Sequence, residues 1–142
     1  MSEYEVIDFD DSWYEKLVEL WLETGLGNPA RGDNLEIINK TLYNGGKLLL
    51  LVDLSANKLY GTAWLTTDYR RIYLHHFGIA KDMQGKGLGK ILMKSCIDFG
   101  RSKNMQMKLE VAADNIYAIK LYKSYGFNTI GDYDLYLLRS YD

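Results

Sequence analysis

Apolar residues recur three or four positions apart in two segments near the start of the chain, residues 12–24 and residues 33–44. This is the spacing of one face of an α-helix. The stretch 25–32 between them holds glycine, asparagine and proline, which are turn-forming residues. Tyr4 to Asp8, ahead of both segments, has the length of a short strand. The pattern therefore predicts a strand followed by two helices that a loop connects.

Both predicted helices begin with the residue pattern of a capping box. Ser12 is followed three residues later by Glu15, and Asp33 is followed by Glu36 at the same spacing. In such a pair the two side chains bond the free backbone N–H groups at the start of the helix. We therefore expect Ser12 and Asp33 to cap the two helices.

The middle of the chain changes to strand-like segments. Residues 47–53 are a continuous apolar run, and residues 58–67 and 72–80 are rich in β-formers, with turn residues between the segments. Three consecutive antiparallel strands are the simplest arrangement. Helical spacing returns over residues 87–103, and the apolar stretch 107–112 has the length of a strand. A strand, a turn, a helix and a strand in this order favour a right-handed crossover between parallel strands.

The last part of the chain predicts one short helix and two further strands. Residues 116–125 keep helical spacing and are followed by Gly126, while residues 127–132 and 134–139 can pair as a terminal hairpin. Neither an internal repeat nor a linker interrupts the pattern. We expect a single domain over residues 1–142, of mixed α/β class, with a central, mostly antiparallel sheet and helices on both faces.

A glycine-rich segment lies between a predicted strand and a predicted helix, Gln84-Gly85-Lys86-Gly87-Leu88-Gly89-Lys90. Its glycines allow a ligand to approach the backbone closely, and the N–H groups at the helix start favour an anion such as phosphate. A P-loop would need serine or threonine after the lysine, and a dinucleotide fingerprint would need differently spaced glycines. The spacing that does fit is Gln-x-x-Gly-x-Gly. A turn without a ligand is the alternative that the glycines alone leave open.

The Gln-x-x-Gly-x-Gly pattern resembles the pyrophosphate-binding motif of the GNAT (Gcn5-related N-acetyltransferase) superfamily. The run from Ile79 to Leu92 is similar to the family's segment from strand four to helix three, with Lys81 where many members have proline. A second motif of the family is matched, in order, by Leu109-Glu110-Val111, Asn115, Ala118, Leu121-Tyr122 and Tyr125-Gly126-Phe127. The resemblance covers residues 72–127, and residues 1–46 are compatible with it.

This resemblance implies an N-acetyltransferase that uses acetyl-coenzyme A (acetyl-CoA), with a sheet that splays between strands four and five. It implies that the backbone of Phe77, Gly78 and Ile79 holds the pantetheine arm and polarises the thioester carbonyl. It also implies that Asn115 and Ala118 lie along the cofactor. The other residues implied in cofactor binding are Gln84, Gly85, Lys86, Gly87, Leu88, Gly89, Lys90 and Tyr122.

The resemblance implies that Tyr122 is the acid that protonates the leaving thiolate. A phenol and a thiol have reference pKa values close enough for this proton transfer. Asn115, Ala118 and Tyr122 would also share one helix face. A base is needed as well, because an amine is mostly ammonium at neutral pH. Glu110 is one candidate, since its spacing from Tyr122 resembles the pair in bacterial ribosomal-protein N-terminal alanine acetyltransferases. A solvent-facing edge carboxylate is the structural alternative for Glu110.

His75 is the second candidate base. Its offset from the glycine motif resembles that of the proton-relaying histidine of arylalkylamine acetyltransferases. Strand alternation is expected to place His76 on the opposite face from Tyr73, His75, Phe77 and Ile79, so that the two histidines cannot share a role. A histidine at the edge of the core is the structural alternative.

Cys96, the sole cysteine, falls on the same helix stripe as Leu92 and Phe99 and is expected to be a small buried residue. Direct attack of the amine on the thioester is therefore favoured over a cysteine intermediate. A coenzyme A binding or sensing module with little catalysis is the alternative from a different functional class. The presence of Tyr122 together with a candidate base favours the enzyme.

Composition narrows the range of partners. The net charge is −2 and the basic residues are spread along the chain, which argues against the basic stripe that nucleic-acid binding needs. One cysteine and the absence of metal-ligand spacing predict neither an internal disulfide nor a metal site. No apolar run approaches the ~18 residues of a membrane span, and we expect a cytoplasmic protein. The expected acceptor is a small-molecule amine or a peptide N-terminus. The sequence leaves open whether the protein forms a homodimer.

Overall fold

The computed structural model describes residues 3–142, which divide into two compact units with the boundary between Glu110 and Val111. The first unit contains a five-stranded sheet, and its strands are β1 (Tyr4–Asp8), β2 (Lys47–Asp53), β3 (Lys58–Thr67), β4 (Arg71–Ile79) and β5 (Gln106–Leu109). Its helices are α1 (Tyr14–Thr24), α2 (Leu35–Tyr43) and α3 (Leu88–Lys103). None of the helices in the described part of the chain combines the length and apolarity that crossing a bilayer requires.

The strands lie in chain order, and only the last pairing is parallel. β1, β2, β3 and β4 pair antiparallel, and α3 crosses over to place β5 parallel to β4. The β4–β5 register ends at the pair Leu74 and Leu109, although β4 continues to Ile79. The expected mixed α/β class, with a mostly antiparallel sheet whose last two strands diverge, is confirmed.

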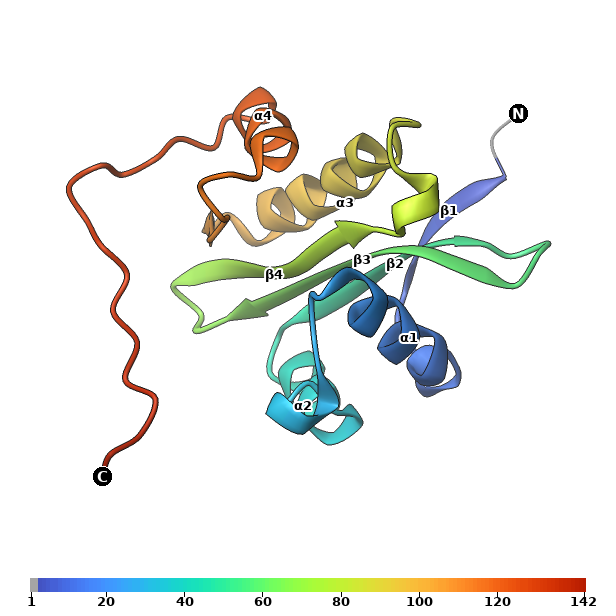
Figure 1. Ribbon diagram of the computed structural model, residues 1–142, viewed down its shortest axis with the longest axis horizontal. Coiled ribbons are helices and arrows are strands. Elements are labelled where there is room, and N and C mark those ends of the chain that lie inside the picture. Colours follow the sequence, from blue (N-terminus) through green and yellow to red (C-terminus); the bar gives the residue numbers. More distant parts are fainter. Residues whose placement is uncertain (1–2) are drawn as a thin grey trace. The chain divides into compact units, whose positions relative to one another are not determined.

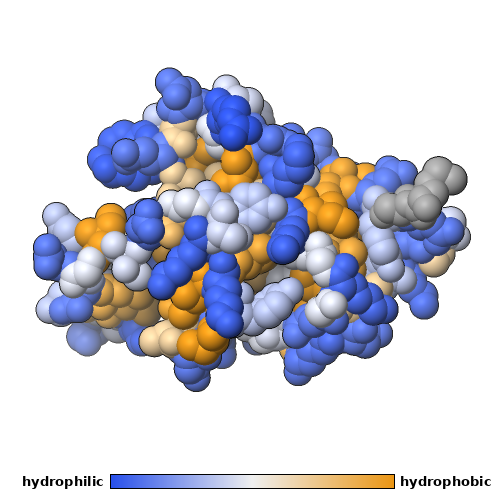
Figure 2. All heavy atoms as spheres, turned by 90° about the horizontal axis from the view of Figure 1, so that it is seen from above, coloured by the Kyte–Doolittle hydropathy of each residue, from blue (hydrophilic) through white to orange (hydrophobic). Residues whose placement is uncertain are grey.

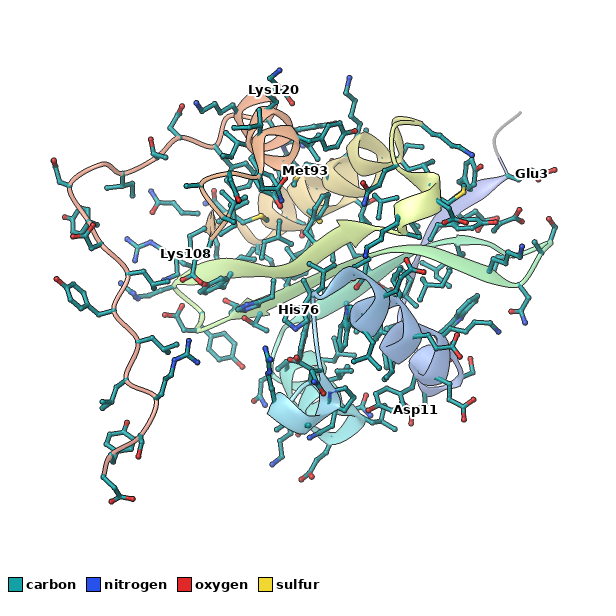
Figure 3. All side chains as sticks on the ribbon, viewed as in Figure 1. Glu3, Asp11, His76, Met93, Lys108 and Lys120 are labelled. Carbon is teal, nitrogen blue, oxygen red and sulfur yellow. The ribbon has the colours of Figure 1, made fainter. Side chains whose placement is uncertain are left out.

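Helices cover both faces of this sheet (Figure 1), with α1 and α2 on one face and α3 on the other. The core on the α1 and α2 face contains Trp21, Ile38 and Trp64. On the other face, α3 buries Leu92, Met93 and Cys96, and Figure 3 labels Met93 on this helix. Because both faces are covered, β2 is buried on both sides, which explains its continuous apolar sequence.

Both expected helix caps are displaced from their predicted residues. Before α1, Asp10 accepts the backbone N–H of Ser12 over 2.8 Å and also the Ser12 hydroxyl, so Ser12 donates instead of capping. Before α2, the side chain of Asn34 accepts the backbone N–H of Ile37 over 3.0 Å. Asp33 is therefore not the cap, and its carboxylate is engaged elsewhere. The helices themselves lie where the periodicity predicts them.

The second unit contains one helix, α4 (Ile116–Ser124), and residues 125–142 form no strand. The predicted terminal hairpin is therefore wrong, as is the extension of β5 to residue 112. An isolated two-stranded hairpin is at best marginally stable, and the described part of this unit offers no third strand to support one. Apolar residues reach the surface among hydrophilic ones (Figure 2), and in this unit Leu135, Tyr136 and Leu138 are exposed.

Candidate active site

β4 contains one extra residue in its pairing with β3. Regular pairing stops at His75 and resumes at Gly78, so His76 and Phe77 together oppose Ala63. His76 has a φ of 47°, in the left-handed region that residues other than glycine seldom adopt. This geometry is a β-bulge, which inserts an unpaired residue and redirects its side chain.

The bulge overturns the expected placement of the two histidines. The ring centroids of His75 and His76 lie 6.2 and 5.4 Å from that of Trp64, and 6.4 Å from each other. Both therefore lie on the face covered by α1 and α2, where Figure 3 shows His76. Because alternation resumes one residue late, Phe77 and Ile79 take the opposite face. The expected placement on opposite faces is therefore wrong, and the roles of the two histidines stay predictions.

His76 connects β4 to the loop that precedes α2. Its Nε2 lies 3.0 Å from Oδ1 of Asp33, and both side chains are about four-fifths buried. The two atoms are within ion-pair distance, but Nε2 of His76 makes no hydrogen bond with the described residues. The other oxygen of Asp33 accepts the backbone N–H of Asn28 over 2.8 Å. Asp33 therefore ties the loop 25–32 to the bulge.

Two glycines allow this loop to approach the sheet. A Cβ atom on Gly27 would lie 2.9 Å from Cδ2 of Trp21 and 3.0 Å from Cδ2 of His76. A Cβ atom on Gly78 would lie 2.5 Å from Cδ1 of Leu26. A side chain on Gly27 would displace the loop from the strand, because the buried Trp21 ring has little room to move, whereas at Gly78 the end of the Leu26 side chain would have to shift.

Replacing Gly27 by alanine is expected to destabilise the fold by about 1–3 kcal/mol through overpacking against Trp21. Gly131 is the matched control, because a Cβ atom there would meet nothing within 4 Å. Urea denaturation of Gly27→Ala and Gly131→Ala measures the difference. Equal stabilities for the two variants would contradict the close approach of the loop.

His75 is a neutral imidazole in this environment. Burial, followed by the nearby His76, lowers the pKa of His75 to about 4. Its Nε2 lies 2.7 Å from the hydroxyl of Thr66, and its ring stacks on that of Tyr73 with centroids 4.0 Å apart. The neutral ring is engaged by the Thr66 hydroxyl and by the Tyr73 ring, so His75 is placed to support neighbouring groups.

Tyr73 is a site residue that the sequence did not reveal. It pairs with Lys108 across the parallel β4–β5 register, and its hydroxyl lies close enough to the carboxylate of Glu110 to interact with it. Burial, and then this contact with Glu110, raises the pKa of Tyr73 well above its usual value. The Lys108 ammonium lies 5.1 Å from the centre of the Tyr73 ring, and Figure 3 labels it beside β4. Thus Glu110, Tyr73 and His75 form one continuous polar strip.

The glycine-rich turn before α3 has the conformation and openness that an anionic ligand requires. Gly85 and Gly87 have φ values of 81° and 78°, and a Cβ atom on either would meet nothing within 4 Å. The side-chain amide of Gln84 donates to the carbonyl of Ile79 over 3.0 Å and thereby closes the turn. Gly87 is the residue that precedes the first turn of α3. The turn therefore presents an open backbone surface at a helix N-terminus, which fits a phosphate group.

The other residues expected around this turn divide into two sets. Leu88 and Gly89 are buried and anchor the start of α3, whereas Lys86 and Lys90 are exposed. The Lys86 ammonium lies 3.7 Å from the sulfur of Met83. Only the exposed members can contact a ligand with their side chains.

The remaining expected residues lie in the second unit. The side chain of Asn115 accepts the backbone N–H of Ala118 over 3.2 Å and so caps α4. The ring of Tyr122 packs edge-on against Phe127, with centroids 5.9 Å apart, and the Phe127 N–H donates to the Tyr122 carbonyl. The structure thus gives Asn115 a local capping role, and the ligand contacts of both residues stay predictions.

Cys96 has no property of an activated nucleophile. It is fully buried within α3, and burial raises the pKa of its thiol to about 12. A thiol with that pKa is almost entirely protonated at neutral pH, and the thiolate is the reactive form. The expected small buried residue is confirmed.

The chain belongs to the acetyltransferase (GNAT) family, whose profile matches residues 8–127. A probable spermine N(1)-acetyltransferase of Bacillus subtilis subsp. natto is 39% identical over 66 residues, which are 45% of this chain and 43% of that protein. The N-alpha-acetyltransferase RimI of Mycobacterium tuberculosis is 38% identical over 58 residues, covering 41% of this chain and 35% of that protein. The chain therefore matches less than half the length of these two relatives.

Solved structures share the fold at low sequence identity. A GNAT-family acetyltransferase from Staphylococcus aureus Mu50 aligns with a TM-score of 0.79 at 22% identity, covering 92% of this chain and 88% of that one. AAC(6')-Iy, solved with a coenzyme A bisubstrate analogue, aligns with a TM-score of 0.79 at 14% identity, covering 98% of this chain and all of that one. These alignments establish the architecture of the sheet and helices.

Proposed function

We propose that this chain transfers the acetyl group of acetyl-CoA directly to a primary amine. The observation that carries the proposal is the strip of Glu110, Tyr73 and His75, which lies on the sheet face that loop 25–32 approaches. Family membership and the open glycine turn support acetyl-CoA as the donor. The thioester supplies the acetyl group, and the protein's own residues hold the donor and move protons.

Glu110 is the proposed base. Its carboxylate is exposed to solvent and interacts with the Tyr73 hydroxyl, so it can accept a proton from an incoming ammonium group directly or through water. The raised pKa of Tyr73 keeps its phenol protonated, which makes it a hydrogen-bond donor and not a competing base. His75 is the weaker candidate, because its half-buried ring is already engaged with the Thr66 hydroxyl and the Tyr73 ring.

Tyr122 is the proposed acid, and it would return a proton to the sulfur of the departing coenzyme A. The backbone of Phe77, Gly78 and Ile79 would hold the thioester, because β4 continues past the last pair that it forms with β5. Residues Gln84 to Lys90 would hold the pyrophosphate. The buried, protonated thiol of Cys96 supports direct transfer without a cysteine intermediate.

The acceptor class is proposed as a small-molecule amine or a peptide N-terminus. The names of the relatives support both, since one is a probable spermine acetyltransferase and another an N-alpha-acetyltransferase. Acetylation assays with amines, polyamines, amino acids and N-terminal peptides test the activity. Acetyl-CoA binding without turnover of any amine would favour a coenzyme A sensor and contradict the proposed enzyme.

Gly87→Val is expected to weaken acetyl-CoA binding at least ten-fold, because a branched side chain at positive φ strains the turn and fills the open surface. Wild-type protein should gain about 2.7 kcal/mol of stability at a hundred times the Kd. Thermal denaturation and calorimetry with acetyl-CoA measure both effects.

Gly32→Val is the matched control for Gly87→Val, because Gly32 also has a positive φ, of 99°, and open space around its Cβ position. It should cause similar backbone strain but leave the acetyl-CoA Kd unchanged. Equal Kd values for wild type and Gly87→Val would contradict the assignment of the turn to the pyrophosphate.

A further inference from the structure

A cavity of about 270 Å³ opens beside the proposed base, between the ends of β3 and β4 and the edge strand β5. Tyr73 lines one part of it, and Tyr73 is the residue that holds Glu110. Thr66, which contacts His75, lines it as well. One water molecule takes up ~30 Å³ in the liquid, so the cavity has room for about nine groups of that size. This is the size of an amino acid with a short carbon chain.

The charged side chains that line this cavity are mostly basic. They are Arg70, Arg71, Lys108 and one acid, Asp68. Asp68 is engaged within its own turn: its Oδ1 accepts the backbone N–H groups of Arg70 and Arg71, each over 2.9 Å. These bonds, with the adjacent Arg70 guanidinium, lower the pKa of Asp68 to about 2. The carboxylate of Asp68 is thus already partnered and adds little attraction for a second cation.

The two other cations have no acidic partner. Within residues 3–142, neither Arg71 nor Lys108 forms an ion pair. Arg71 donates from Nε to the amide oxygen of Gln106 over 3.2 Å, which orients its guanidinium across β5. Lys108 lies over the ring of Tyr73. Two cations thus line a cavity that is also lined by Tyr73, the residue whose hydroxyl interacts with the Glu110 carboxylate.

The strand geometry sets the spacing between these opposite charges. Lys108 is two residues before Glu110, which directly follows the last residue of β5, and Arg71 pairs with Gln106, two residues earlier again. At ~3.3 Å per residue these levels lie roughly 7 and 13 Å from Glu110. An amine at Glu110 and an anion near Lys108 and Arg71 would therefore be separated by several bonds.

We propose that the acceptor is an amphoteric small molecule, with its amine at Glu110 and a carboxylate or similar anion several bonds away, held by Arg71 and Lys108. This inference rests on the proposed transfer to an amine and names the class of acceptor. A polyamine would place its second ammonium group against Arg71 and Lys108, where like charges repel. An α-amino acid would be too short to reach both ends.

Three acceptors of similar length test this proposal: ε-aminocaproate, hexylamine and hexamethylenediamine. Wild-type kcat/KM should be highest for ε-aminocaproate and lowest for the diamine. In Arg71→Gln and Lys108→Gln, the preference for ε-aminocaproate over hexylamine should fall about ten-fold, as expected for a lost charge-assisted hydrogen bond. Arg71→Glu should reverse the preference toward the diamine. Arg101→Gln is the control, because Arg101 lies on α3 and pairs with Asp98.

Calorimetry with ε-aminocaproate in the presence of coenzyme A tests the subsite without turnover. Binding that weakens in Arg71→Gln and persists in Arg101→Gln supports the subsite. If such binding occurs and no amine is acetylated, the proposed function is contradicted and the subsite is not. A peptide that begins with glycine and glutamate tests whether the acceptor is a free small molecule or the N-terminus of a peptide. A wild-type preference for the diamine, or a preference unchanged in all the charge variants, would overturn the proposal.

Discussion

Replacing Tyr122 by phenylalanine is expected to lower kcat about a hundred-fold or more while leaving the Kd of acetyl-CoA nearly unchanged. The change removes one hydroxyl and almost no volume, so the packing of the ring against Phe127 is kept. What is lost is the proton donor to the departing thiolate, and general acid catalysis contributes about 10²–10⁴-fold. Steady-state kinetics on an identified amine, with calorimetry for acetyl-CoA, measures the two quantities separately.

Tyr117→Phe is the matched control, since Tyr117 lies on the same helix and its side chain is exposed. Wild-type turnover is expected for this variant. The assignment of the acid fails if Tyr122→Phe also turns over at the wild-type rate while the chemical step limits the reaction.

Glu110→Gln is expected to lower kcat/KM about 10²–10⁴-fold at neutral pH and to abolish the acid-side limb of the pH–rate profile. Glutamine has nearly the same size and can still accept a hydrogen bond from the Tyr73 hydroxyl, so the local structure is kept while the carboxylate is lost. The profile between about pH 3 and 9 identifies the group whose deprotonation activates the enzyme, because carboxyl groups ordinarily titrate near about pH 4.

Two neighbouring variants separate the base from its surroundings. Tyr73→Phe keeps the carboxylate and should therefore keep the acid limb, with a smaller loss of rate. His75→Gln should keep it too, because a pKa of about 4 leaves His75 neutral over most of the measured range. If His75→Gln removes the limb and Glu110→Gln retains it, the histidine is the base.

The regular elements were predictable because periodicity depends on local sequence. The segments 47–53 and 58–67 form strands with the predicted bounds, and α3 starts one residue after its predicted first residue, Gly87. The cap positions were not predictable in the same way. Asp33 and Asn34 are both residue types that cap helices, and it is Asn34 that caps α2. Asp33 instead contacts His76, which is distant in sequence, so local sequence alone could not decide between the two.

The candidate site shows the same division between local and long-range information. Glu110 and His75 were identified from their spacing to motifs, but Tyr73 was not, because its contact with Glu110 depends on the parallel register of β4 and β5. The bulge at His76 was missed because no glycine or asparagine marks the positive φ there. The terminal hairpin was predicted from β-forming residues alone, and such residues need partner strands to form a sheet.

The bulge in β4 behaves as a one-residue insertion into an otherwise regular ladder. If His76 were deleted, Phe77 would pair with Ala63, and every other pair between β3 and β4 would keep its partner and its face. The sheet itself therefore does not require this residue. What the insertion adds is an imidazole directed at Asp33, so that a single added codon links the strand that carries His75 to the loop ahead of α2. Gain or loss of that codon offers a short evolutionary route by which the loop could be attached to or released from an otherwise unchanged sheet.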